Sequence, residues 1–166
     1  LYVVEYSGDA ERKRAEYLFN NWEEGTIERP EGLVRIAEGI AHDELHEQLV
    51  AKVPAEQVTV HELEPIETDV EAESIVVEET VEASVDAVET FLEYILSKRK
   101  AVLQSAARNE YEVYSKKGRA EVSHEVVAGD PVTVRIRVNG YPPAPAFIAD
   151  FFETELADYA ASQSSE

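Results

Sequence analysis

Apolar residues alternate with polar ones, or recur at helical spacing, along most of the chain, which indicates folded elements. In the first 65 residues the pattern predicts strand, helix, strand, helix, strand. The strands are short β-branched or aromatic runs at 1–6, 33–37 and 58–63, and the helices cover 10–22 and 42–53. Two such helices are expected to cover one or both faces of a small sheet.

The second half of the chain predicts one strand, one long helix, three strands and a closing helix. Their expected ranges are 74–81, 85–108 with Ser84 as the N-cap, 111–115, 120–127, 132–138 and 146–160. The strand at 132–138 has the clearest alternation, with Val132, Val134, Ile136 and Val138 on one side and polar residues on the other. The turns between the last three strands are short enough for hairpins, so this sheet is expected to be partly antiparallel.

The fold class predicted from these elements is α+β, with two interlocked halves. Residues 1–66 are expected to form a small α/β subdomain, 67–73 an acidic linker, 74–160 an α+β subdomain with a long helix and a three-strand meander, and 161–166 a frayed tail.

Charge changes how the polar positions are interpreted. The chain has 166 residues and a formal net charge of −20, with only 15 basic residues. Such a charge destabilises a compact state in dilute salt, whereas in molar salt the Debye length falls to about 3 Å and most of the repulsion is screened. The composition resembles that of cytosolic proteins from salt-in halophilic archaea. On this interpretation, acidic clusters are mostly solvated surface and weak evidence for acid–base or metal chemistry.

Several function classes lack their sequence signals. The chain has no Cys, which excludes disulfides, thiolate zinc sites and a cysteine nucleophile. It has no apolar run near the roughly 18 residues of a membrane span, and neither a dinucleotide fingerprint nor a Walker phosphate loop. We therefore expect a cytoplasmic protein with no cofactor, no membrane partner and no identifiable small-molecule ligand.

Residues 98–137 differ from the rest of the chain because they hold nine of the 15 basic residues against five acidic ones. Basic residues interleaved with aromatic ones on a sheet could hold RNA or single-stranded DNA through phosphate contacts and stacking. The candidate nucleic-acid-binding residues are Lys98, Lys100, Lys116, Lys117, Arg119 and Arg135. Two alternatives remain open: cross-strand ion pairs of Glu121 and Glu125 with Arg135 and Arg137, or self-association with the acidic region 53–97 of a second subunit.

Histidines provide the other candidate chemistry. His42 and His46 stand at i, i+4, the spacing of zinc ligands in zincin proteases, but Asp43 replaces the Glu that those enzymes need after the first His. A metal-dependent hydrolase is therefore the third functional hypothesis. His124 alternates with apolar residues of its strand, which predicts a partly buried structural histidine.

The leading hypothesis is a non-enzymatic, salt-adapted interaction or regulatory protein that forms a homodimer. The long helix and the closing helix are expected to supply the interface, through Phe91, Ile95, Leu96, Phe151 and Phe152. A strand, a helix, a meander and a closing apolar helix are also similar to helix-grip ligand-binding proteins. The predicted strands are too few for that fold, so a lipid or small-molecule cavity is kept only as a minor alternative.

Overall fold

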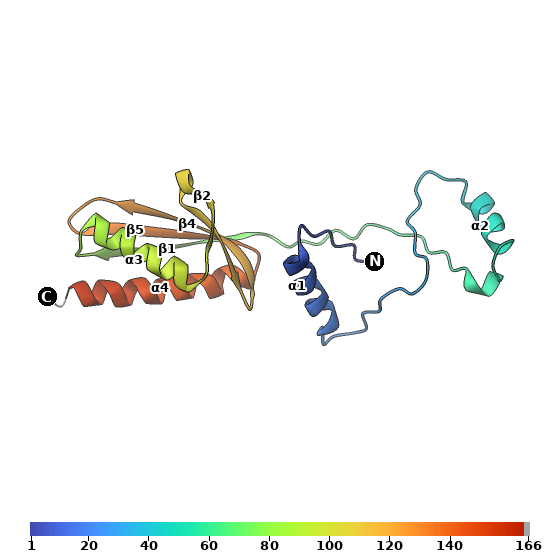
Figure 1. Ribbon diagram of the computed structural model, residues 1–166, viewed down its shortest axis with the longest axis horizontal. Helices are drawn as coiled ribbons and strands as arrows, with labels where there is room; N and C mark the ends of the chain where they lie inside the picture. The colour runs from blue at the N-terminus through green and yellow to red at the C-terminus, as the bar shows by residue number, and fades with distance from the viewer. Residues whose placement is uncertain (165–166) are drawn as a thin grey trace. The chain divides into compact units, whose positions relative to one another are not determined.

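The computed structural model describes residues 1–164 and divides the chain into two compact units, Leu1–Ile66 and Glu67–Glu166 (Figure 1). Its class is α+β: four α-helices and one five-stranded sheet. The α+β prediction is therefore confirmed. Within the described residues, no helix has both the length and the apolar character needed to cross a bilayer.

The unit 67–166 contains the whole sheet. Its elements in chain order are β1 (Glu73–Val81), α3 (Val85–Lys98), β2 (Val102–Ser105), β3 (Glu110–Ser115), β4 (Gly118–Val127), β5 (Val132–Gly140) and α4 (Ala144–Gln163). The strand order is β1-β5-β4-β3-β2, and every neighbouring pair is antiparallel. The first and last strands of the chain, β1 and β5, are therefore neighbours in the sheet.

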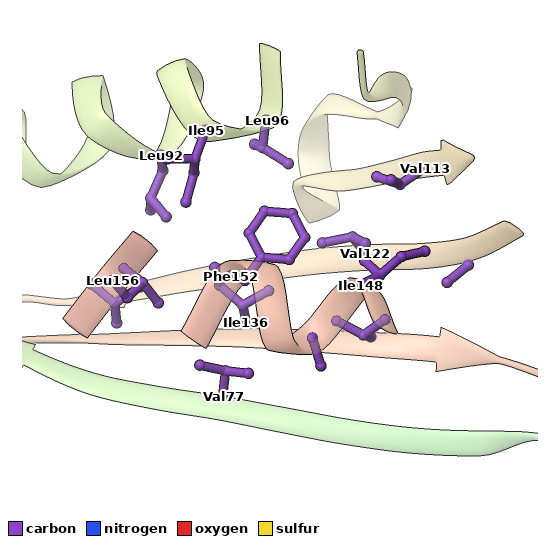
Figure 2. Packing of buried hydrophobic residues seen from close by; sticks show 14 of the residues in the cluster. Val77, Leu92, Ile95, Leu96, Val113, Val122, Ile136, Ile148, Phe152 and Leu156 are labelled. Carbon is purple, nitrogen blue, oxygen red and sulfur yellow. The ribbon is translucent and has the colours of Figure 1, made fainter. Parts of the chain in front are cut away.

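Strand alternation gives the sheet one apolar face and one polar face. On β5, Val132, Val134, Ile136 and Val138 are buried, as their alternation predicted. Helices α3 and α4 cover this apolar face (Figure 2). Phe152, Ile148 and Leu156 of α4 are fully buried between the helices and the sheet.

Helix α3 is shorter than predicted because it ends in a Schellman motif at a residue that is not glycine. Ser84 caps its start by accepting a hydrogen bond from the Ala87 N–H at 3.3 Å. At its end Lys100 has φ 52°, and the Ala101 N–H donates to the Leu96 carbonyl at 3.0 Å. This left-handed residue stops the helix ten residues before the expected end, Arg108. The chain then forms β2, which the sequence did not predict.

The unit 1–66 contains α1 (Asp9–Asn20), α2 (His42–Val50) and a 3₁₀ turn (Ala55–Gln57). The predicted strands at 1–6, 33–37 and 58–63 do not form, so the β-α-β-α-β prediction is wrong for this half. A β-branched run favours extended backbone, but a strand also needs a partner for its hydrogen bonds, and none of these segments has one within the described residues.

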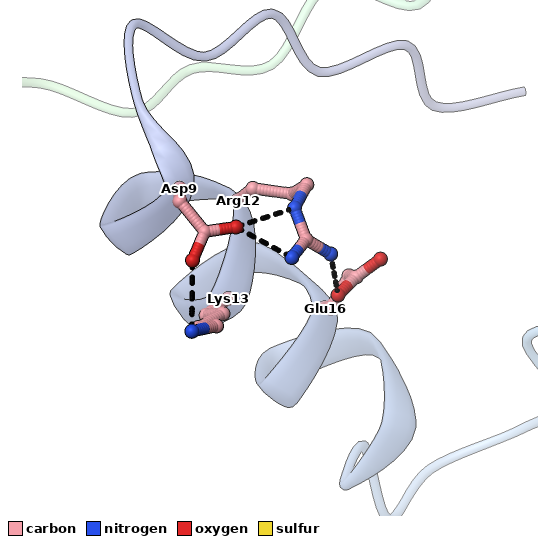
Figure 3. Close-up of polar contacts among 4 residues, drawn as sticks. All are labelled: Asp9, Arg12, Lys13 and Glu16. Atoms are coloured by element: carbon pink, nitrogen blue, oxygen red, sulfur yellow. Dashed lines mark hydrogen bonds and ion pairs between the residues drawn. The ribbon is translucent and has the colours of Figure 1, made fainter.

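Ion pairs stabilise α1 on its exposed surface (Figure 3). Asp9 accepts from Arg12 at 2.6 Å and pairs with Lys13 at 2.8 Å, while Arg12 also reaches Glu16 at 2.6 Å. These hydrogen bonds from Lys13 and Arg12 lower the pKa of Asp9. Asp9 lies in the first turn, where a negative charge also complements the helix dipole.

The C-terminal helix is longer than predicted. The range expected to be a frayed tail, 161–166, is helical as far as Gln163. The last two residues of that range lie outside the described residues.

Candidate functional site

Three cationic side chains converge on two phenylalanines at one end of the domain. The Arg99 guanidinium carbon lies 3.9 Å from the ring centroid of Phe151 and 5.8 Å from that of Phe147. Lys116 Nζ lies 5.3 Å from the Phe147 centroid, and Lys98 Nζ lies 5.7 Å from the Phe151 centroid. We call Lys98, Arg99, Lys116, Phe147 and Phe151 the cationic-aromatic surface.

Three structural elements build the cationic-aromatic surface. Phe147 and Phe151 are one turn apart on α4 and only half-buried, so their rings remain accessible beside the core. The Schellman motif ends α3 directly after Lys98 and Arg99. The register Ser115↔Gly118 places Lys116 at the tip of the β3–β4 hairpin.

A close approach brings that hairpin next to the start of α4. Gly118 has φ 127°, and a Cβ added there would lie 3.2 Å from the Ala144 Cβ. Ala144 is the first residue of α4, so Gly118 allows the hairpin tip to approach the turn that carries Phe147. The cationic-aromatic surface therefore depends on both the backbone freedom and the small size of glycine at this position.

Charge on the surface is only partly neutralised. Lys98 forms an ion pair with Glu155 at 2.6 Å, and this hydrogen bond raises the pKa of Lys98. Arg99 and Lys116 form no ion pair with any described residue. The Nε of Arg99 is buried without a hydrogen-bond partner among the described residues, and its guanidinium carbon lies over the Phe151 ring. Cation–π contacts of this kind contribute about 0.5–1 kcal/mol each when exposed.

The six residues predicted to bind nucleic acid fall in two places. Lys98 and Lys116 belong to the cationic-aromatic surface, and Lys100 and Lys117 follow within two residues of them in the chain. Arg119 and Arg135 lie instead on the polar face of the sheet. The structure therefore does not gather all six into one strip.

On the polar face Arg119 and Arg135 are paired with carboxylates. Arg119 contacts Glu112 at 2.8 Å, and Arg135 contacts Glu78 and, at 4.0 Å, Glu125. Glu125 stands directly opposite Arg135 in the ladder, so the predicted cross-strand ion pair is confirmed for these two residues. The predicted pairing of Glu121 with Arg137 differs, because Glu121 faces Asn139 and Arg137 faces Ser123.

A shallow depression of about 420 Å³ lies on this polar face. Its charged lining residues carry both signs in equal number: Arg108, Arg135 and Arg137 against Glu110, Glu121 and Glu125. Arg108 and Glu110 also pair with each other at 2.8 Å. Balanced charge of this kind stabilises the sheet surface and gives little attraction for a polyanion.

Three of the five residues predicted to form a dimer interface lie in the core. Ile95 and Phe152 are 0% exposed and Leu96 is 4% exposed, so these side chains offer no surface to a partner. Phe91 and Phe151 are half-buried and remain partly accessible. Phe151 contributes this accessible area to the cationic-aromatic surface.

The candidate metal ligands lie on α2. His42 Nε2 is exposed and lies 3.2 Å from Asp43 Oδ1, and the buried Nδ1 of His46 has no hydrogen-bond partner within residues 1–164. Among the described residues, no group of three or more His, Asp and Glu side chains is arranged to hold a metal ion. The structure therefore gives His42 and His46 no third ligand.

His124 lies on the apolar face, opposite Ile136, as its alternation predicted. Its ring stacks on Tyr111 with centroids 5.8 Å apart. Burial lowers the pKa of His124, an effect that the nearby carboxylates of Glu89 and Glu93 oppose. Its Nδ1 has no hydrogen-bond partner among the described residues, so His124 is held by packing.

Sequence reasoning missed Arg99 and Phe147 as members of a site. The available signals were the Lys98-Arg99-Lys100 run at the end of a helix and the i, i+4 spacing of Phe147 and Phe151. Neither signal indicates that the two helices meet.

Comparisons with known family models, curated proteins and solved structures found no match for this chain.

Proposed function

We propose that this protein is a non-enzymatic interaction protein that associates with itself and is adapted to concentrated salt. The observation that carries this proposal is the exposure of apolar side chains in the unit 1–66. Not one residue of that unit is buried, and most of the exposed large apolar side chains of the described chain lie in it. A unit that leaves its apolar residues in water gains stability when a partner covers them.

Helix α2 shows how such a surface is arranged. Leu45 and Leu49 are 44% and 39% exposed, and Val53, just beyond the helix, is 40% exposed. Their i, i+4, i+8 spacing aligns them on one side, as in an amphipathic helix that docks into an apolar groove. Association would remove this stripe from water.

Salt concentration controls the electrostatic repulsion between two copies of the chain. Each carries a formal charge of −20, so two copies repel each other strongly in dilute buffer. Near 1 M salt the Debye length is about 3 Å, which removes the long-range repulsion and leaves apolar contacts largely intact. Self-association is therefore expected to strengthen as KCl is raised.

Light scattering coupled to size-exclusion chromatography tests the proposal. We expect a dimer at about 2 M KCl and a larger monomer fraction at about 0.2 M. The variant Leu45→Asp/Leu49→Asp should be monomeric at both concentrations, because it places two carboxylates on the stripe. The control Gln48→Glu/Gln57→Glu adds two charges without removing apolar area and should behave as the wild type. A wild-type monomer at 2 M KCl would overturn the proposal.

A further inference from the structure

An acidic segment of the chain is chemically complementary to the cationic-aromatic surface. Residues 62–72 read ELEPIETDVEA and carry five carboxylates with no basic residue. Apolar side chains lie between them, with Ile66 87% and Val70 60% exposed. The segment contains no helix or strand, and none of its carboxylates forms an ion pair with a described residue.

The sheet register places the point where this segment enters β1 at the same end of the domain as the cationic-aromatic surface. The segment enters β1 at Glu73, which pairs with Gly140 on β5. Gly140 also pairs with Ala120 on β4, two residues beyond Gly118 at the hairpin tip. Strands are about 4.8 Å apart, so the entry of the segment lies roughly 10 Å across the sheet from the hairpin strand.

We propose that the cationic-aromatic surface of one copy binds the acidic segment 62–72 of a second copy, and that the exchange is reciprocal. This inference rests on the proposed self-association and names the surfaces that perform part of it. Carboxylates such as Glu67 and Asp69 pair with Arg99 and Lys116, and Ile66 packs on the phenylalanine rings. Because each copy carries both partners at one end, a two-fold axis near that end satisfies both contacts and closes the dimer.

Charge complementarity favours the second copy over nucleic acid as the occupant. A body of net charge −20 repels a polyanion, and Arg119 and Arg135, which would extend a nucleic-acid footprint, contact Glu112 and Glu78. A short acidic peptide needs only the local cations. Ion pairs within about 4 Å lose less to salt than repulsion acting over tens of ångströms, so the contact is compatible with molar KCl.

A charge exchange between two variants tests this inference. The surface variant is Lys116→Glu/Lys117→Glu, and the segment variant is Glu67→Lys/Asp69→Lys/Glu71→Lys. Each variant alone places like charges together at both contacts, so we expect its dimer dissociation constant to rise at least about tenfold at 0.5 M KCl. An equimolar mixture restores opposite charges at both contacts and should return the dissociation constant to within about threefold of wild type.

Matched controls separate local pairing from net charge. Arg29→Glu/Lys52→Glu makes the same charge change as the surface variant, and Glu23→Lys/Glu24→Lys/Glu28→Lys matches the segment variant. Both controls alter residues outside the segment and the surface and should leave the dissociation constant within about threefold of wild type. Circular dichroism of every variant confirms that the fold is retained.

The outcomes distinguish the two proposals. If the wild type is a dimer and the charge variants remain dimers, the inference fails while self-association stands. If both variants are monomers and their mixture stays monomeric, the segment binds its own chain and the reciprocal exchange is overturned. A wild-type monomer whose 260 nm absorbance disappears in the surface variant would show nucleic acid as the occupant and overturn the inference. A monomer without bound nucleic acid overturns both proposals.

Discussion

Phe91 of α3 and Tyr159 of α4 stack nearly parallel, with ring centroids 4.0 Å apart and planes 9° apart. Both rings are partly buried and pack against the core. The pair joins the two helices, and Lys98 with Glu155 adds an ion pair between the same helices. This junction adds to the core contacts of Ile148, Phe152 and Leu156 that hold α4, the helix that carries Phe147 and Phe151.

Substitution of the stacked pair should lower stability by more than the loss of buried area alone. We expect Phe91→Leu and Tyr159→Leu each to reduce the free energy of unfolding by about 1–2 kcal/mol. A double-mutant cycle should give a coupling energy of about 1 kcal/mol. Urea unfolding in 2 M KCl measures both, and Tyr141→Leu, at a ring that is 60% exposed, serves as the control. A coupling energy near zero would show that the rings contribute only buried area.

Substitution of Leu96 tests whether this residue belongs to the hydrophobic core or to a dimer interface. Leu96→Asp places a carboxylate at a site that is 4% exposed, next to the Phe152 ring, and should unfold the 67–166 unit. Far-UV circular dichroism should show the loss of both sheet and helix signal. Tyr94→Asp puts the same residue on the same helix at a position 57% exposed and should leave the fold intact. If Leu96→Asp instead gave a folded monomer, the result would support the prediction that Leu96 lies in a dimer interface.

Alternation made most of the sheet predictable from the sequence. Strands β1, β3, β4 and β5 lie within two residues of their expected bounds, because apolar and polar positions alternate over their whole length. The end of α3 was not predictable, because Lys100 adopts the left-handed conformation that a sequence normally marks with glycine. Continuing apolar residues at Val102 and Leu103 then fitted a helix as well as a strand.

The N-terminal strands failed for a different reason. Runs such as Leu1–Tyr6 have the composition of a strand, but composition does not supply a neighbouring strand. The candidate site was predictable only in part. The cationic window was visible as an excess of basic residues, whereas the convergence of Arg99, Lys116 and Phe147 depends on the packing of α3, the hairpin and α4.

His124 should make stability depend on pH. Burial lowers its pKa below the ordinary value of 6.5, so the folded state binds fewer protons than the unfolded state as pH falls. The contribution of neutral His124 is thus fully present above pH 6.5 and is lost as pH falls from that value towards the lowered pKa. Urea unfolding between pH 7.5 and 5.5 should show a decline in the wild type that is reduced in His124→Gln. An equal decline in both proteins would contradict the burial of this histidine.

Gly118 provides the sharpest test of how the hairpin meets α4. Gly118→Ala forces a side chain into a backbone with φ 127° and brings its Cβ within 3.2 Å of the Ala144 Cβ. We expect a loss of about 1–3 kcal/mol in the free energy of unfolding. Gly8→Ala is the control, because nothing lies within 4 Å of its added Cβ and its φ is −164°.

Adding Ala144→Gly to Gly118→Ala removes the contact but not the backbone strain. The double variant should therefore be less destabilised than the two single losses added together, by about 0.5 kcal/mol or more. Strict additivity would mean that α4 does not press on the hairpin, and that the approach of Lys116 to Phe147 has another cause.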